Sequence, residues 1–271
     1  MVTDDPFVQS RETVNPYLSS GIVIFQRFLW DMKYQSWLSR ARLKKIKNSQ
    51  LNEKAVILCN GPSLLNVDFD LLIASGVFTF GLNKIDLLFK KTEFRPSCIV
   101  AVNPHVIEQN KEFYNKTEIP LYLDSIGVKK QINFRNNVSY LHSTSIPKFA
   151  KDCSFSVNQG HTVTAVALQL AFHMGFKQVA LVGADHNFDT KGPANKLVVA
   201  GEKDENHFDP NYFSKGVKWE LPDLFESEVW YGRANQMYNA HERKIYNATT
   251  GGLLEVFNRI TLSSFLNDKQ G

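Results

Sequence analysis

The stretch Ala55-Val56-Ile57-Leu58-Cys59-Asn60-Gly61-Pro62-Ser63-Leu64 decides the fold of this chain. Its apolar half is typical of a parallel strand that is buried on both faces, because such strands read as continuous aliphatic runs. The Asn-Gly-Pro-Ser half predicts a turn whose small residues let a ligand approach the backbone, with Ser63 placed to cap the next element. In open α/β sheets, ligands bind beyond the carboxyl ends of the strands. The segment therefore predicts both an α/β fold and the position of a site.

The bulk composition is that of a globular protein in a reducing compartment. The chain has 271 residues, of which 43% are hydrophobic and 21% are charged, and this length suits one large α/β domain. Its net charge of +4 is too small and too evenly spread to indicate nucleic acid as a partner. Three cysteines lie far apart, in neither a disulfide nor a zinc pattern. Without a signal-peptide pattern or an apolar run of about 18 residues, the sequence predicts a cytoplasmic protein.

Residues 1–54 are predicted to form an N-terminal arm followed by a helix over residues 20–47. In this segment, apolar and aromatic residues lead into a basic run made of Arg40, Arg42, Lys44, Lys45 and Lys47. A basic amphipathic helix can lie on an anionic membrane surface, which would make the protein peripheral to the inner face of a membrane. The alternative, favoured by the polar residues scattered along the segment, is a helix packed on the domain with a solvated basic end.

Residues 55–271 are predicted to form one Rossmann-like nucleotide-binding domain. Apolar runs that indicate strands begin at residues 55, 78, 98, 121, 138 and 178, and a long apolar helix that opens at Gly160 stops at Gly175. Strands that alternate with helical patterns favour a mostly parallel sheet with helices on both faces. Residues 189–216 are polar and without period, which predicts a lid loop.

Four of the predicted strands end in a polar residue, namely Asn60, Asn83, Asn103 and Asp185. Because the carboxyl ends of parallel strands meet at one edge of a sheet, these side chains can converge. An asparagine offers two donors and an acceptor, which suits the recognition of a base, a ribose or a sugar hydroxyl. The alternative is that each asparagine only caps or turns the chain.

The turn before the long helix is a candidate phosphate site. Backbone N–H groups and the positive end of the helix dipole at Gly160 attract phosphate, and the hydroxyl of Thr162 or Thr164 could contribute. This is not a P-loop, because the Gly-Lys-Ser/Thr ending is absent. Ordinary capping of the helix is the alternative interpretation.

His207 is the leading candidate for a general base. It lies in the predicted lid among acidic residues, and an imidazole near carboxylates can have a pKa suited to proton transfer near neutral pH. His186, next to Asp185, is the second candidate. His173 lies on an apolar helix face and is predicted to be packed rather than catalytic. No set of histidines has the spacing of zinc ligands, so no metal site is predicted.

Together these pieces resemble glycosyltransferase family 42, the bacterial sialyltransferases, and the wider group of Maf-type and 6-hydroxymethylpterin diphosphokinase MptE-like domains. The matching segments are residues 60–64, 81–83, 102–104, 175–188 and 206–208, in the order of the family. Residues 246–257 resemble the Maf-type and MptE-like group in particular. The resemblance implies a Rossmann-like sheet with a lid, a CMP-sugar donor held by asparagines at strand ends, and a lid histidine that deprotonates the acceptor hydroxyl.

Carried over residue by residue, the resemblance implies a nucleotide site and a base. The nucleotide site would contain Asn60, Gly61, Ser63, Asn83 and Asn103, and the base would be His207. The chain departs from the sialyltransferases at two places. Gln159-Gly160 stands where they have an arginine before the long helix, and Phe188-Asp189 stands where tyrosines would assist the departing phosphate.

Three functions remain open from the sequence. The favoured one is a glycosyltransferase in surface polysaccharide or glycoconjugate assembly, with a nucleotide-sugar donor, a glycan or lipid-linked acceptor and no required cofactor. The second is a diphosphokinase that moves pyrophosphate from ATP to a hydroxymethylpterin, with Mg²⁺ held near Asp185 and the acidic lid. The third is a non-catalytic nucleotide-binding protein.

Overall fold

A parallel β-sheet forms the centre of the computed structural model, which describes residues 15–128, 131–187, 193–201, 203–213 and 215–268. Its eight strands follow the order β10-β9-β6-β1-β2-β3-β4-β5, and each neighbouring pair is parallel. The strands are β1 (Lys54–Leu58), β2 (Phe78–Leu82), β3 (Cys98–Ala101), β4 (Leu121–Asp124), β5 (Val138–Leu141), β6 (Gln178–Val182), β9 (Lys244–Asn247) and β10 (Asn258–Arg259). The predicted α/β class with a mostly parallel sheet is confirmed.

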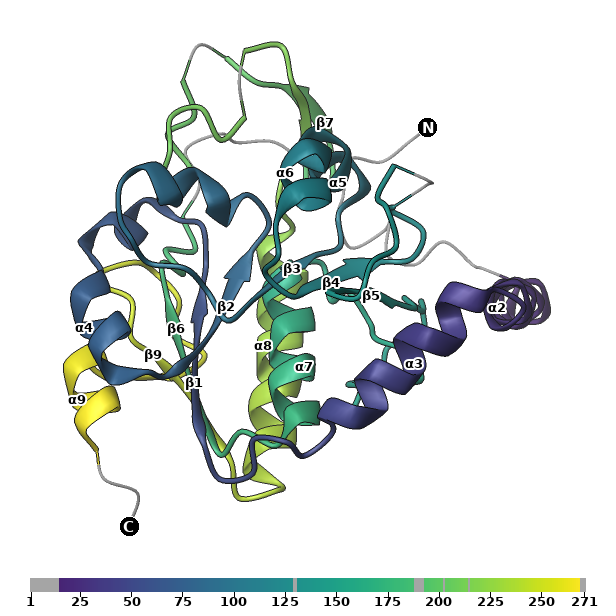
Figure 1. Cartoon of the computed structure of the whole chain (residues 1–271). Helices are drawn as coiled ribbons and strands as arrows, with labels where there is room; N and C mark the ends of the chain where they lie inside the picture. Colours follow the sequence, from purple (N-terminus) through teal and green to yellow (C-terminus); the bar gives the residue numbers. More distant parts are fainter. Residues whose placement is uncertain (1–14, 129–130, 188–192, 202, 214, 269–271) are drawn as a thin grey trace.

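Helices cover both faces of this sheet, which explains the aliphatic run of β1 (Figure 1). Ile57 enters the core beneath α7 and α8, whereas Leu58 enters the core on the opposite face. The first face is covered by α7 (Val163–Met174) and α8 (Leu224–Asn239). The second face is covered by η1 (Pro62–Asn66), α4 (Phe69–Ser75), η2 (Ile85–Lys90), α5 (Pro104–Gln109), α6 (Lys111–Lys116) and α9 (Leu262–Asn267). Both faces of β1 are therefore buried.

The strand order reverses between β1 and β6. From β1 the chain runs outward through β2, β3 and β4 to the edge strand β5, then returns through α7 to β6 on the other side of β1. Such a reversal opens a crevice at the carboxyl ends of the two strands. Here the ends are joined by a hydrogen bond from Gly61 N to Gly183 O at 2.9 Å. The topology thus places a site where the opening sequence motif predicts one.

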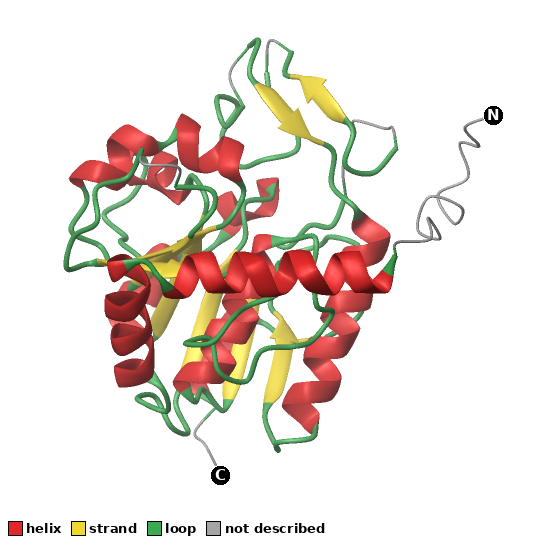
Figure 2. Ribbon diagram, turned by 90° about the vertical axis from the view of Figure 1, so that its right-hand side faces the viewer, coloured by secondary structure: helices red, strands yellow, loops and turns green. Residues whose placement is uncertain are grey.

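The predicted single helix over residues 20–47 is two helices that meet at a corner (Figure 2). They are α2 (Pro16–Asp31) and α3 (Tyr34–Ile46). The Asp31 carboxylate holds the corner, since it accepts hydrogen bonds from Arg27 Nε at 2.8 Å and Arg40 NH1 at 3.0 Å. The prediction of one helix was wrong because the Arg40 contact, which crosses the corner between residues nine apart, leaves no local signal. The predicted arm over residues 1–19 lies mostly outside the described residues.

Helix α3 covers the edge of the sheet. The backbone N–H of Tyr140 in β5 donates to Ser39 Oγ at 2.9 Å, and Arg42 donates to the carbonyl oxygen of Val138. An edge strand otherwise presents unpaired N–H and C=O groups to other chains. Buried Leu43 of α3 also enters the core that lies beneath α7. Helix α3 is therefore bound to the sheet by specific polar and apolar contacts.

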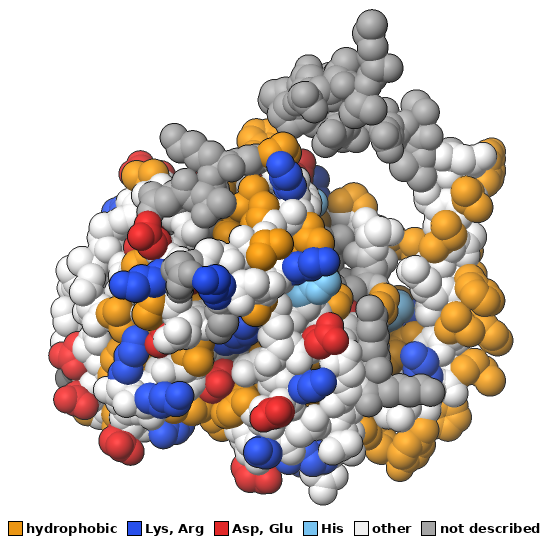
Figure 3. Space-filling view, turned by 90° about the horizontal axis from the view of Figure 1, so that it is seen from above, with side chains coloured by type: hydrophobic (Ala, Val, Ile, Leu, Met, Phe, Trp, Pro, Cys, Tyr) orange, Lys and Arg blue, Asp and Glu red, His pale blue; other side chains and the backbone are white. Residues whose placement is uncertain are grey.

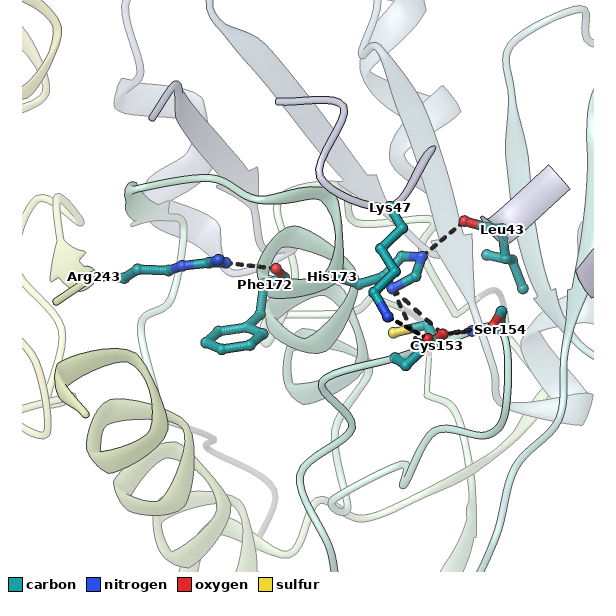
Figure 4. A network of polar contacts seen from close by, with 8 residues as sticks. Leu43, Lys47, Cys153, Ser154, Phe172, His173 and Arg243 are labelled. Carbon is teal, nitrogen blue, oxygen red and sulfur yellow. Dashed lines mark hydrogen bonds and ion pairs between the residues drawn. The ribbon is translucent and has the colours of Figure 1, made fainter. Parts of the chain in front are cut away.

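His173 of α7 joins α3 to the interior (Figure 4). Its Nε2 lies 2.8 Å from Leu43 O, and Nδ1 accepts from Cys153 N at 3.3 Å. These partners require a neutral ring with its proton on Nε2. Burial lowers the pKa of His173, which favours the same neutral form. This histidine is packed, as its apolar helix face predicts.

The predicted lid loop over residues 189–216 contains part of a second, small sheet. Strand β7 (Leu197–Val199) pairs in antiparallel fashion with β8 (Lys218–Glu220), above the carboxyl edge of the main sheet (Figure 2). The sequence of the predicted lid loop gives no sign of β7, because this strand is only three residues long and gains order from a partner outside the loop. Residues 189–192 lie outside the described part of the chain.

We expect acid to destabilise the fold through His142. Its ring stacks on Trp30 of α2, with centroids 5.8 Å apart. Burial lowers the pKa of His142 from its ordinary value of 6.5 to about 4, and Arg27 acts in the same direction. Between these values the unfolded chain binds more protons than the folded one, so stability falls as the pH falls through this window. The loss attributable to His142 is at most about 3 kcal/mol at pH 4.

Urea unfolding at pH 7 and pH 4 would measure this loss for the wild type and for His142→Phe, which keeps an aromatic ring against Trp30. The variant is expected to lose less stability between the two pH values than the wild type does. Equal losses for the two proteins would contradict the assignment.

Candidate functional site

A cavity of about 720 Å³ lies at the carboxyl edge of the main sheet. This size is within the range of small-molecule and cofactor sites. Its wall is formed by the ends of β1, β2, β3 and β6, the start of α7, the lid and α8, and Figure 3 views this side of the molecule. The predicted site residues that line it are Asn60, Gly61, Asn83, Asn103, Gly160, Thr162, Thr164, Asp185, His186 and His207. Pro62 and Ser63 lie behind this wall.

Asp185 holds the turn that follows β1. Its Oδ2 accepts from Ser63 N at 3.1 Å and from Ser63 Oγ at 2.8 Å, so the Ser63 hydroxyl serves the turn rather than the cavity. A Cβ atom at position 61 would lie 2.0 Å from Asp185 Oδ2. Only glycine therefore fits at position 61 while Asp185 keeps this place.

Two asparagines at the cavity have buried side-chain oxygens to which no donor among the described residues is bonded. Asn60 is only 9% exposed and lines the cavity, and its Oδ1 accepts no hydrogen bond from the described residues. Asn83 also lines the cavity, and its Oδ1 likewise accepts no hydrogen bond from the described residues. A buried acceptor without a partner costs free energy, but both oxygens are shielded from the cavity, so a ligand would bond them only after the amide groups turn. Asn103 differs, since its Oδ1 accepts from His105 N at 2.9 Å and so caps α5.

The start of α7 faces the same cavity. Thr162 Oγ1 accepts from Thr164 N and caps the helix, whereas Thr164 Oγ1 lies 3.6 Å from the thiol of Cys59. The preceding turn is fixed by buried Gln169, which donates to Asn158 O at 2.7 Å and accepts from Asn158 N at 3.2 Å. The positive end of the helix dipole is thereby held against the cavity, where it favours an anion.

His207 has a buried carboxylate behind it. Its Nδ1 lies 2.8 Å from Asp204 Oδ2, and the Asp204 side chain is only 4% exposed. This contact keeps a proton on Nδ1 and makes Nε2 the basic nitrogen. The ring also stacks on Tyr212, with centroids 4.0 Å apart and planes 2° from parallel. Orientation by a carboxylate and an aromatic ring is what a general base requires.

The lid segment that carries His207 is bound to the sheet from below. Phe208 N donates to Asn60 O at 3.0 Å, and Lys84 Nζ donates to Tyr212 O at 2.7 Å. Burial lowers the pKa of Lys84 to about 8. Sequence reasoning missed Lys84, although it directly follows the strand-end residue Asn83. Its role depends on a lid that is far away in the sequence.

Two acidic residues of the lid contact basic side chains of the protein. Asp204 contacts His207, and Asp209 lies 3.0 Å from Lys91 Nζ. Glu202 lies outside the described residues. Within the part of the chain that the structure describes, no group of three or more His, Cys, Asp or Glu side chains could hold a metal ion. The residues present would offer Mg²⁺ chiefly the carboxylate of Asp185.

The second histidine candidate and two tyrosines complete the cavity wall. His186 Nε2 lies 2.9 Å from Glu228 Oε1, on α8. The phenols that line the cavity are those of Tyr212 and Tyr231. Burial raises the pKa of Tyr231 to about 12, so its hydroxyl stays protonated near neutral pH. Sequence reasoning missed Tyr231 because it lies about 40 residues after Phe188 and Asp189, where the resemblance to the sialyltransferases placed the tyrosines. Phe188 and Asp189 themselves lie outside the described residues.

The fold and its cavity define a Rossmann-like α/β domain with a ligand site at the switch point of the sheet. The model of the 6-hydroxymethylpterin diphosphokinase MptE-like family matches residues 30–191, which is more than half of the chain. The chain therefore belongs to this family. A search of curated proteins gave no match.

The fold is also similar to the solved structure of a MAf glycosyltransferase from Magnetospirillum magneticum AMB-1. The TM-score is 0.51 at 16% sequence identity, and the similarity covers 85% of this chain. It covers 38% of that glycosyltransferase, so the chain spans less than half of its length. At this identity the similarity supports a shared fold. It is consistent with the expected resemblance to Maf-type and MptE-like domains.

We predict that Gly61→Ala destabilises the protein and weakens ligand binding, because the new methyl group would displace Asp185 from the turn after β1. Gly21→Ala is the matched control, since a Cβ there has no atom within 4 Å and lies in an exposed helix. The control is expected to be as stable as the wild type or more stable by up to about 1 kcal/mol. Thermal unfolding of the three proteins measures the difference. Equal midpoints for Gly61→Ala and the wild type would contradict the close approach.

Proposed function

We propose that the protein is a glycosyltransferase that uses a nucleotide-activated sugar donor of the CMP type. The observation that carries the proposal is the pairing of His207 with buried Asp204 in the wall of a cavity that also receives the start of α7. A base for an acceptor hydroxyl and an anion site for a departing phosphate are the two functions that sugar transfer requires. The fold shared with a MAf glycosyltransferase supports the same class.

The proposed step is a displacement at the anomeric carbon of the donor. His207 Nε2 takes the proton of the acceptor hydroxyl as the acceptor oxygen forms its bond to that carbon. The bond between the carbon and the phosphate oxygen breaks, and the nucleoside monophosphate leaves with the electron pair. The dipole of α7 and the hydroxyl of Tyr231 stabilise the charge on the leaving phosphate. The amides of Asn60 and Asn83 line the cavity and, once turned toward it, would bond the nucleotide or the sugar.

The charges in the cavity wall favour a donor with one phosphate. Among the described residues that line the cavity, the carboxylates are Asp185 and Glu220, and there is no lysine or arginine. A helix start supplies the equivalent of roughly half a positive charge, which suits a single phosphodiester better than a triphosphate. The pyrophosphoryl transfer from ATP in the name of the family remains the second candidate, with Mg²⁺ near Asp185. A nucleotide-binding protein without catalysis is the third.

A thermal-shift comparison of CMP, UDP, GDP and ATP, each with Mg²⁺ and with EDTA, is expected to separate these candidates. CMP should raise the unfolding midpoint by several degrees at about 100 times its Kd, and EDTA should leave that shift unchanged. A shift with ATP that EDTA abolishes would instead support the diphosphokinase. Stabilisation by none of the nucleotides would argue against all three candidates.

His207→Gln is predicted to lower turnover by about 10²–10⁴-fold while nucleotide binding changes little, because a general base acts in the chemical step. Asp204→Asn should lower turnover less, since the base remains but loses its orienting carboxylate. His241→Gln is the matched control, because His241 is exposed and lies outside the cavity wall. The readout is kcat and KM for hydrolysis or transfer of a CMP-sugar. Unchanged kcat in His207→Gln would remove His207 as the base.

A further inference from the structure

Helix α2 is oriented with its polar side toward the protein. Arg27 donates to Phe155 O and lies over the Phe155 ring at 4.2 Å. Gln26 lines the cavity, and Trp30 is buried against His142. Amphipathic helices on globular domains normally do the opposite and turn their apolar stripe to the core. The outward side of α2 therefore needs an explanation.

That outward side is almost entirely apolar. Its exposed large hydrophobic residues, together with the C-cap residue Met32, are 46–87% exposed; they are Tyr17, Leu18, Ile22, Ile24, Phe25, Phe28, Leu29 and Met32. At about 100° per residue they span an arc of roughly 160°, wider than the narrow seam of a two-stranded coiled coil. In the view from above, hydrophobic side chains gather along the outer side of this helix, on the right (Figure 3). A surface of this kind indicates an apolar environment outside the protein.

The charge around this surface indicates which environment. Residues 15–52 contain seven lysines and arginines and a single acidic residue, Asp31, which pairs with Arg27 and Arg40. Lys47 pairs with Asp152, and the other exposed basic residues are Lys33, Lys44 and Lys45. Exposed Tyr34 and Trp37 follow the apolar surface at the start of α3, and exposed Lys44 and Lys45 follow them. Along the chain the order is therefore apolar, then amphipathic aromatic, then basic, and these are the kinds of residue that contact the acyl chains, the interface and the anionic headgroups of a membrane.

We propose that α2 lies in the surface of an anionic membrane, with the lysines of α3 on the lipid headgroups. Among the described helices, none is long and apolar enough to cross a bilayer, so the contact is along the surface. Because Gln26 of α2 lines the cavity, the contact brings the cavity beside the membrane. If the proposed glycosyltransferase function holds, the acceptor is therefore a lipid-linked one.

The test is sedimentation of the full chain with vesicles of phosphatidylcholine alone or of phosphatidylcholine and phosphatidylglycerol at a ratio of about 7:3, which models an anionic leaflet. The wild type should bind the anionic vesicles, and Ile24→Ser/Phe28→Ser should bind at least about tenfold more weakly. Both side chains are mostly exposed, so the double variant should remain folded. The matched control is Leu51→Ser/Ile73→Ser, which removes two exposed apolar side chains elsewhere and should bind like the wild type.

A second pair of variants tests the headgroup contact. Lys44→Gln/Lys45→Gln should lose about tenfold in affinity for anionic vesicles and most of its dependence on salt.

Equal binding of the wild type to both vesicle compositions would overturn the anionic preference. Failure to bind either composition would overturn the membrane proposal. If Ile24→Ser/Phe28→Ser instead converts a dimer to a monomer in light scattering without any vesicle binding, the surface is an interface between two copies.

Nucleotide thermal shifts on the same samples separate the two proposals. Vesicle binding without nucleotide binding would retain the membrane contact and remove the glycosyltransferase. Nucleotide binding without vesicle binding would do the reverse.

Discussion

The rest of the structure depends on the close approach of the two loops that follow β1 and β6. Gly61 N donates to Gly183 O, and the Asp185 carboxylate bonds the backbone and hydroxyl of Ser63. A Cβ atom at position 183 would lie 2.5 Å from Cys59 O, so side chains are excluded on both sides of the contact. Because the strand order reverses at this point, the contact fixes the floor of the cavity. The other walls are built around it.

Each of those walls is held by polar groups that the protein satisfies internally. Buried Gln169 binds the turn before α7, and Lys84 binds the lid segment at Tyr212. Asp204 orients His207. The acceptors of Asn60 and Asn83 stand apart from this pattern, since the described residues give them no donor. Both oxygens are shielded from the cavity, so a polar ligand would gain these two acceptors only by turning the amides, while the rest of the wall stays fixed.

Sequence patterns were most informative where the cause is local. Glycine after α7 and the aliphatic run of β1 mark elements whose geometry follows from neighbouring residues. The candidate site residues were found because parallel strands bring their carboxyl ends together, and ten of the twelve line one cavity. Their roles were less predictable. Asn103 caps a helix and Ser63 serves Asp185, which only the positions of their partners reveal. Lys84 and Tyr231 were missed because their partners lie far away in the sequence.

The sequence by itself determined the fold class, the parallel strands and the edge of the sheet that carries the site. These follow from hydrophobic patterning and turn chemistry, which act over a few residues. Only the tertiary structure decided that Asp204 supports His207 and that the N-terminal segment turns a corner at Asp31. It also decided which side of α2 faces outward. Periodicity shows that a helix has two sides, but which side faces the protein depends on what the folded chain places next to it. Here Arg27 contacts Phe155 and Trp30 stacks on His142, so the apolar side of α2 faces outward.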